Sequence, residues 1–260
     1  MNAIPKIRNA FSPTFLKTFN KCQRSAIFDT FSSNDKILFG NTVHDLLSKI
    51  YALDVQLDRS YFLKNIEYEL QQGKLKGADF VTFWKKALSI NAFLKAGAFD
   101  PPEGFSILDV ESQNIPIEFR EIIYGKRFFL VPLLNDNKKV RGNIDIIYYN
   151  PDSNSLLIRD WKTGTSPNDP FQVSLYMLTV IVAYGINPEV TQVTGEYVYV
   201  ENNKRVVTDY CEKELLKFLE HIQHIVDTYY KAYTLRFFTT SPSFDNCRFC
   251  TVTDCGERKG

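Results

Sequence analysis

Two acidic residues and one lysine lie on two neighbouring strand-like segments near the middle of the chain. Asp145 closes the segment 140–145, and Asp160 and Lys162 lie in the segment 157–164. Side chains two positions apart on a strand point to the same face, so Asp160 and Lys162 share one face of a sheet. Unpaired charges destabilise an apolar core, whereas converging carboxylates beside an ammonium group can hold a divalent metal next to a phosphate.

An acid-x-lysine triplet is common by chance, and this chain contains three of them. The triplet at 136–138 falls in a polar turn, and the triplet at 257–259 falls in a charged stretch after the last motif. Only the triplet at 160–162 ends an apolar segment and has a partner acid on the preceding segment. The context therefore selects this triplet. Two alternatives without chemistry stay open. Asp160 and Lys162 would then form a purely structural ion pair, and Asp145 would be an ordinary carboxylate in the turn at the end of a strand.

The composition is that of a globular protein long enough for one large domain. The chain has 260 residues, a net charge of +1, and 44% hydrophobic and 14% aromatic residues. A net charge so close to zero excludes a global basic field, so any polyanion must be bound by a local groove. No apolar run approaches the ~20 residues that span a bilayer, and no charged start precedes an apolar signal core. We therefore expect no membrane association and a cytoplasmic location.

The N-terminal part of the sequence predicts helices. Ser12 followed by a proline is typical of a helix start, and this short helix extends to about Lys21. A long, partly amphipathic helix is expected over 40–72 with a break near Leu57, and another helix over 79–96. A proline- and glycine-containing breaker follows.

Strand signals dominate the centre of the sequence before helical patterns return. Strands are expected over 105–119, 128–134, 140–149, 155–162 and 190–200, with 205–208 pairing with the last of them. Helices are expected over 170–184 and 209–233. This order predicts a mixed α/β core preceded by a helical section.

The five cysteines divide into a cluster and two isolated residues. Cys247, Cys250 and Cys255 form a C-x2-C-x4-C pattern among polar residues, which indicates metal or cluster binding. Three local thiolates need a fourth ligand, and Cys22, which lies between basic residues, is the candidate. Zinc and an iron–sulfur cluster suit four thiolates equally well. Cys211 is interpreted as an isolated core thiol, and disulfides are not expected in a reducing compartment.

Six motifs follow one another along the chain in a recognisable order. They are Cys22, Gly40-Asn41-Thr42-Val43-His44, Gly142-Asn143-Ile144-Asp145, Asp160-Trp161-Lys162-Thr163-Gly164, Gln172-Val173-Ser174-Leu175-Tyr176 and the terminal cysteine trio. In this order they resemble the RecB/AddB-like branch of the PD-(D/E)XK nuclease superfamily, and CRISPR-associated RecB-like exonucleases with an iron–sulfur staple share the layout. Two positions depart from the family: four residues separate the last two cysteines where five are frequent, and Gln23 stands where proline is frequent.

The resemblance implies a restriction-endonuclease-like α/β fold with a mixed central sheet flanked by helices. We expect a single RecB-like nuclease domain over 1–260. Within it we expect a helical section over 40–100, a catalytic sheet core over 105–208, and a closing helix with a C-terminal cysteine cluster over 209–260.

The resemblance also implies a metal-dependent DNA nuclease. The expected activity is that of a single-strand exonuclease, with 5′ to 3′ polarity and additional endonuclease activity as open points. The expected context is recombination, end processing, phage DNA metabolism or CRISPR adaptation, with single-stranded DNA or DNA ends as substrate and a helicase or integrase as partner. The alternative is a non-catalytic, cluster-stapled DNA-binding module of a larger complex.

The expected metal is Mg²⁺ or Mn²⁺, because hard cations prefer oxygen ligands. Asp145 and Asp160 are the expected carboxylate ligands, and the resemblance adds the main-chain carbonyl of Trp161 and the His44 side chain. Lys162 is expected to orient the attacking water and to stabilise charge on the phosphate. Without the resemblance, His44 reads as a hydrogen-bonded core histidine. The resemblance also favours a 4Fe-4S cluster over Zn²⁺ at the cysteines.

Further candidate residues lie around this set. Gln172 and Tyr176 are four residues apart on one helix face, where they either contact DNA or order Lys162, or form a polar turn of an amphipathic helix. Glu111 is either a water-mediated support for the metal or an ordinary strand carboxylate. The basic residues expected to hold phosphates are Lys17, Lys21, Arg24, Lys138, Lys139 and Arg141.

Overall fold

The computed structural model describes most of the predicted helices and strands. The described residues are 8, 10–28, 35–52, 58–73, 75, 77–113, 122–124, 127–129, 139–140, 143–164, 169–183, 186, 190–241, 252 and 255. Cys247, Cys250, Lys138 and Arg141 lie outside this set, and their predicted roles stay predictions.

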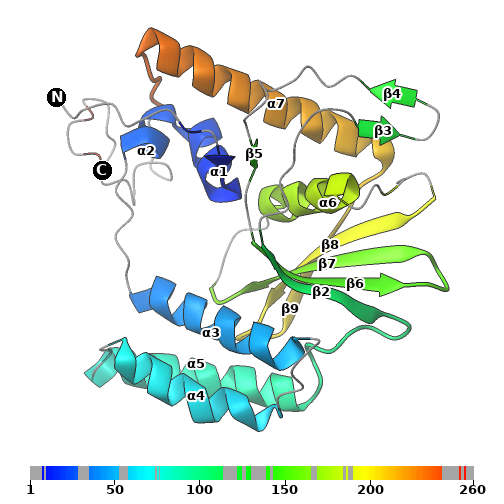
Figure 1. Ribbon diagram of the computed structural model, residues 1–260. Coiled ribbons are helices and arrows are strands. Elements are labelled where there is room, and N and C mark those ends of the chain that lie inside the picture. The colour runs from blue at the N-terminus through cyan, green and yellow to red at the C-terminus, as the bar shows by residue number, and fades with distance from the viewer. Residues whose placement is uncertain are drawn as a thin grey trace.

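A mixed five-stranded sheet forms the centre of the molecule (Figure 1). Its strand order is β2 (Ser106–Gln113), β6 (Asn143–Asn150), β7 (Ser155–Lys162), β8 (Gln192–Tyr199) and β9 (Lys204–Asp209). β7 and β8 are parallel, whereas the other neighbours are antiparallel. A parallel pair needs a crossover connection, and α6 (Phe171–Ala183) provides it.

Helices cover both faces of the sheet (Figure 1). One face is covered by α3 (Asp35–Tyr51), α4 (Ser60–Gln72) and α5 (Gly77–Lys95), and the other by α6 and α7 (Glu212–Leu235). The remaining elements are α1 (Pro13–Lys21), α2 (Gln23–Phe28), and the short strand pairs β1 (Ala10–Phe11) with β5 (Lys139–Val140) and β3 (Ile122–Tyr124) with β4 (Arg127–Phe129). The predicted mixed α/β architecture is therefore confirmed.

The segment predicted as one long helix over 40–72 contains two helices. α3 begins earlier than expected, at Asp35, and ends at Tyr51, and α4 begins at Ser60. The predicted break near Leu57 lies between them in the sequence. Two antiparallel helices can bury their apolar faces against each other, which one continuous helix cannot do.

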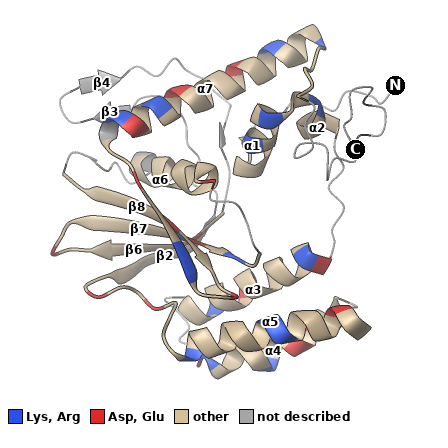
Figure 2. Ribbon diagram, turned by 180° about the vertical axis from the view of Figure 1, so that it is seen from behind, with Lys and Arg blue, Asp and Glu red and all other residues tan. Residues whose placement is uncertain are grey.

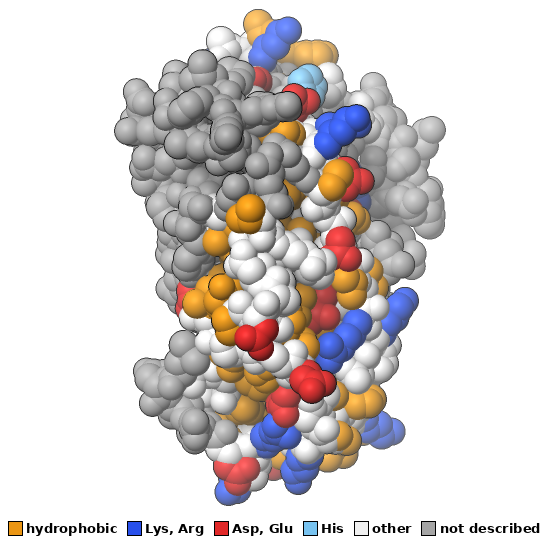
Figure 3. Space-filling model, turned by 90° about the vertical axis from the view of Figure 1, so that its right-hand side faces the viewer, with side chains coloured by type: hydrophobic (Ala, Val, Ile, Leu, Met, Phe, Trp, Pro, Cys, Tyr) orange, Lys and Arg blue, Asp and Glu red, His pale blue; other side chains and the backbone are white. Residues whose placement is uncertain are grey.

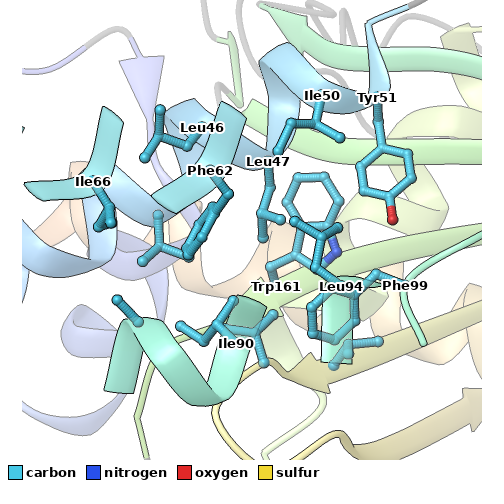
Figure 4. Close-up of a cluster of buried hydrophobic side chains, with 14 of the residues drawn as sticks. Leu46, Leu47, Ile50, Tyr51, Phe62, Ile66, Ile90, Leu94, Phe99 and Trp161 are labelled. Atoms are coloured by element: carbon cyan, nitrogen blue, oxygen red, sulfur yellow. The ribbon is translucent and has the colours of Figure 1, made fainter. Parts of the chain in front are cut away.

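Trp161 is the largest side chain in the core between the sheet and α3–α5. It is fully buried, and it points to the face opposite Asp160, as strand alternation requires. Figure 4 shows Leu47 and Tyr51 of α3 and Leu94 of α5 around the indole ring. Burial of a side chain of this size stabilises the fold by about 3 kcal/mol. This packing fixes the end of β7 against α3.

On the opposite face, α6 approaches β8 closely because a glycine lies at the contact. A Cβ atom at Gly195 would lie 2.7 Å from a methyl group of Val173 and 2.8 Å from the sulfur of Met177. Only a residue without a side chain allows this separation. The close approach sets the position of α6, and with it that of Gln172 and Tyr176.

α7 closes this face together with α1. Buried aromatic rings of α1, including Phe15 and Phe19, surround Tyr229 of α7. Both acidic and basic residues lie along α7, as Figure 2 shows. No helix in the described part of the chain is both long and apolar enough to cross a membrane.

Candidate active site

The two predicted acids lie where β6 and β7 separate. The pairing of these strands runs from Asn150 opposite Ser155 to Ile146 opposite Arg159, so Asp145 and Asp160 occupy the next positions, beyond the last pair. Beyond this pair, the Asp145 side chain accepts a hydrogen bond from the main chain of β7.

The main-chain N–H of Trp161 donates to Asp145 Oδ2 over 2.7 Å. A carboxylate thus satisfies a main-chain donor that a neighbouring strand normally satisfies. The strand ends can part without leaving this buried donor unpaired, and the two acids stand at the opening.

This opening leads into a single cleft of about 1320 Å³, which we call the active-site cleft. The predicted residues that line it are His44, Asp145, Asp160, Trp161, Lys162, Gln172 and Tyr176. α1 contributes its first residues to the rim, and α3 contributes one long side. The structure therefore brings together all the predicted non-cysteine site residues.

Gln172 connects three of these side chains. Its Oε1 accepts a hydrogen bond from Lys162 Nζ (2.9 Å), and its Nε2 donates to Asp160 Oδ1 (3.2 Å) and to Tyr176 Oη (2.9 Å). Lys162 also forms an ion pair with Asp160. Of the expectations for Gln172, the contact that orders Lys162 is the one observed.

His44 reaches the site from α3. Its Nδ1 donates to Asp145 Oδ1 over 3.0 Å. One turn earlier, Gly40 permits close packing, since a Cβ atom there would lie 2.9 Å from Thr163 Oγ1 at the end of β7. The glycine thereby lets α3 bring His44 to the two acids.

The surroundings of Asp160 and His44 shift the pKa values of both side chains upward. Burial, opposed by Lys162 and assisted by Asp145, raises the pKa of Asp160 to about 6. Burial disfavours the charged form of His44, but Asp145 and Asp160 outweigh it and raise the pKa of this histidine above its usual value. Both groups hold their protons more tightly than usual, which is the behaviour of a site that attracts cations.

The donor set fits a hard divalent cation. Carboxylate oxygens are the ligands that Mg²⁺ and Mn²⁺ prefer, and the carboxylates of Asp145 and Asp160 both line the active-site cleft. Among the described residues, however, no three His, Cys, Asp or Glu side chains form a preformed metal site. His44 contacts Asp145 and Lys162 contacts Asp160, so a metal ion would have to displace these contacts to reach the carboxylates.

Several residues of the active-site cleft have no signal in the sequence. Lys36 lies on its rim, and Lys86 forms an ion pair with Glu201 over 2.9 Å at its far end. Their spacing along the chain is irregular, so only the fold brings them to one surface.

Some predicted residues take other positions. Lys17 and Lys21 lie 2.9 Å and 4.0 Å from Asp169 instead of lining the active-site cleft. The prediction that Cys211 is a core thiol is wrong, because this residue is exposed at the N-cap of α7. The side chain of Glu111 lies outside the described residues.

The segment that follows α7 lies beside the segment that follows Cys22. The main-chain N–H of Thr239 donates to Gln23 Oε1 (3.0 Å), and the N–H of Arg24 donates to the Thr239 carbonyl (3.3 Å). The chain that leaves α7 therefore returns to the residues that directly follow Cys22. Cys22 and Cys255 are half-buried free thiols.

A mixed sheet whose diverging strands present two acids and a lysine to a cleft defines a metal-dependent nuclease class. The chain belongs to the PD-(D/E)XK nuclease superfamily, whose family model matches residues 10–255. The predicted superfamily is confirmed, and nucleases of this superfamily typically use divalent metals such as Mg²⁺.

Curated relatives and solved structures give further comparisons. The chain is 30% identical over 119 residues to the Gene 69 protein of Mycobacterium phage D29 and 29% identical over 126 residues to that of Mycobacterium phage L5. Each match covers 45% of this chain, but only 42% and 39% of the two relatives. A candidate exonuclease from Eubacterium rectale has a TM-score of 0.44 and 10% identity, over 94% of this chain and 86% of that chain.

Proposed function

We propose that this protein is a metal-dependent deoxyribonuclease of the RecB/AddB-like branch that hydrolyses phosphodiester bonds. One observation carries the proposal: β6 and β7 diverge at Asp145 and Asp160, so these acids and Lys162 line one open cleft. Buried structural charges have no need of such an opening, whereas a reaction on a DNA backbone requires it.

The residues divide the work of such a reaction among themselves. Asp145, Asp160, His44 and the Trp161 carbonyl would hold Mg²⁺ or Mn²⁺, which supplies an activated water and neutralises phosphate charge when bound. His44 ligates only in its neutral form, so the second ring proton of the protonated imidazole must be lost before it binds the metal.

Lys162 supplies the positive charge that the protein itself brings to the phosphate. Its ammonium group donates to Gln172 and pairs with Asp160, so it is held at the acids. From there it orients the water and stabilises charge that develops in the transition state. Gln172 and Tyr176 keep this geometry through their mutual hydrogen bond.

For the substrate, we propose single-stranded DNA or DNA with single-stranded ends, cleaved as by an exonuclease with 5′ to 3′ polarity. The resemblance of the motifs supports this choice. Acidic and basic side chains are mixed on the face shown in Figure 3. DNA would therefore be bound by local contacts with its phosphates and not by one continuous basic surface. Among the expected contexts, the two relatives from phages favour phage DNA metabolism. The proposed partner, a helicase or integrase, rests on the resemblance of the motifs alone.

For the cysteines, we propose a 4Fe-4S cluster held by Cys22, Cys247, Cys250 and Cys255, with Zn²⁺ as the alternative. The contacts of Thr239 beside Cys22 support it, because Thr239 precedes the cysteine trio by a few residues. Anaerobic purification followed by iron and zinc analysis distinguishes the two. A brown protein with iron supports the cluster, and a colourless protein with zinc contradicts it.

The proposed activity is tested with end-labelled single- and double-stranded DNA in the presence of Mg²⁺, Mn²⁺ or a chelator. The wild-type protein should cleave with either metal, and Lys162→Gln should lose nearly all activity. Lys85→Gln, which changes an exposed lysine of α5, is the matched control and should cleave normally.

One observation favours a second candidate, a non-catalytic DNA-binding module: His44 and Lys162 already contact the carboxylates. A wild-type protein that binds labelled DNA but never cleaves it would establish that role. Full cleavage by Lys162→Gln would also contradict the proposed nuclease mechanism.

A further inference from the structure

Tyr197 of β8 lies beside the site, although none of the sequence motifs contains it. β8 pairs with β7 in parallel, and the register places Tyr197 opposite Asp160. Neighbouring residues in register point to the same face of a sheet, so the Tyr197 side chain shares the face of Asp160 and Lys162. The side chain is only 3% exposed and does not line the active-site cleft, so it lies behind the lining residues.

The ring of Tyr197 contacts the lysine of the site. Lys162 Nζ lies 5.1 Å from the ring centroid, within the ~6 Å range in which an aromatic face attracts a cation. The ammonium group is thus bounded by Asp160, by Gln172 and by this ring. The ring offers no competing hydrogen-bond acceptor on its side, so it restricts where Lys162 can point without neutralising its charge.

The hydroxyl group of Tyr197 has a separate partner. It accepts a hydrogen bond from the main-chain N–H of Val173 over 3.0 Å. Val173 lies in the first turn of α6, where N–H groups have no partner within the helix. It directly follows Gln172, which holds Lys162 and Asp160. One side chain therefore fixes the lysine through its ring and the start of α6 through its hydroxyl group.

We propose that Tyr197 is a positioning residue that holds Lys162 in the orientation used for phosphodiester cleavage. This inference rests on the proposed nuclease function and adds to it a residue on a third strand. The ring is the essential part, because it contacts the lysine directly. The hydroxyl group acts only through α6, and its loss has the smaller effect.

The kinetic test compares Tyr197→Leu, which removes the ring, with Tyr197→Phe, which keeps it. In Mn²⁺-dependent DNA cleavage, Tyr197→Leu should lower kcat by about tenfold while KM changes by less than about twofold. Tyr197→Phe should retain at least about a third of the wild-type kcat. Equal rates for the wild type and Tyr197→Leu, or equal losses in both variants, overturn the proposal.

A spectroscopic test separates positioning from general packing. In protein with ¹³C-labelled lysine, the Lys162 signal is identified by its absence in Lys162→Gln. The Tyr197 ring should shift the ε-protons of Lys162, and this shift should disappear in Tyr197→Leu, persist in Tyr197→Phe, and leave the Lys85 signal unchanged. An unaltered Lys162 shift in Tyr197→Leu overturns the proposal. If this variant does not fold, Tyr197→Met replaces it in both tests.

The two tests also separate this inference from the proposed function. A wild-type protein that cleaves no DNA with either metal refutes the proposed function, and the lysine signals then decide whether Tyr197 holds Lys162. A wild-type protein that cleaves DNA, together with a fully active Tyr197→Leu, refutes the positioning role alone.

Discussion

Two neighbouring residues of β7, Arg159 and Asp160, belong to two different clusters of buried charge on opposite faces of the sheet. Arg159 is completely buried and forms an ion pair with Glu196. It also donates to the Phe99 carbonyl (2.7 Å) and to Tyr148 Oη (2.8 Å). Asp160 is equally inaccessible as a residue, at 2% exposure, but its cluster borders the active-site cleft.

The clusters differ in their partners and in the exposure of those partners: the side chains of His44 and Lys162 are 27% and 25% exposed, whereas those of Arg159 and Glu196 are 0% and 4% exposed. Around Arg159, a guanidinium group meets one carboxylate, two main-chain carbonyls and a hydroxyl group, none of which lines the active-site cleft. Around Asp160, two acids share one lysine and one histidine, which a metal ion can displace. The comparison shows that buried charge by itself does not indicate a functional site. A functional site is indicated when the partners of the buried charge can be displaced by a ligand and lie beside an open cleft.

The largest expected effect separates the clusters by activity. Asp160→Asn should lower the rate of metal-dependent DNA cleavage by at least about 100- to 1,000-fold, because the neutral amide no longer binds the cation. Its free energy of unfolding should stay within about 1 kcal/mol of the wild type. Cleavage assays and urea unfolding measure both, with the exposed Asp152→Asn as a fully active control. Normal activity of Asp160→Asn would remove the acid from the mechanism.

The reverse pattern is expected for the closed cluster. Arg159→Met leaves the buried Glu196 with only the exposed Arg205, 3.8 Å away, as a nearby cation, which should lower the free energy of unfolding by about 3–5 kcal/mol. In the double variant Arg159→Met/Glu196→Met, most of this loss should be recovered, because the charge that remains, on Arg205, is exposed to water. Urea unfolding at neutral pH measures both variants. A single variant as stable as the wild type would show that this ion pair is not structural.

The two clusters should also differ in their response to pH. Protons compete with a metal ion for Asp160, with a pKa of about 6, and for His44, whose pKa is raised. The affinity for Mn²⁺ should therefore fall as the pH falls through these values, by at least about tenfold from pH 7.5 to pH 5.5. Isothermal titration measures it. Arg159→Met, tested at a temperature where it is folded, should show the same slope, whereas Asp160→Asn should show a shallower one. An affinity independent of pH contradicts the assignment.

A smaller effect tests how α3 is held at the active-site cleft. Gly40→Ala introduces a methyl group 2.9 Å from Thr163 Oγ1, which must displace either the Thr163 side chain or α3 with its His44. We expect cleavage to fall by about three- to tenfold. Gly164→Ala is the matched control, since a Cβ atom there has no neighbour within 4 Å. Equal rates for both variants would show that the contact is not needed.

Strand alternation explains how much of this site the sequence could predict. It places Asp160 and Lys162 on one face and Trp161 on the other, as observed. It does not give the register between β7 and β8, which are joined by the α6 crossover. The position of Tyr197 opposite Asp160 was therefore inaccessible to sequence reasoning.

Long-range pairing limits the sequence prediction in the same way elsewhere. Arg159 and Glu196 are 37 positions apart in the sequence, and the folded sheet brings them together. Lys17 was expected to hold phosphate, but Asp169 is its partner in the structure. The pattern of charges along a chain shows which residues can do chemistry, whereas their partners depend on tertiary contacts.

Anomalous diffraction from crystals of this protein soaked in Mn²⁺ tests the central claim most directly. We predict one strong peak between the carboxylates of Asp145 and Asp160, with Lys162 released from its ion pair. A saturating soak that leaves both acids paired with His44 and Lys162, with no peak at the end of β7, would contradict the account.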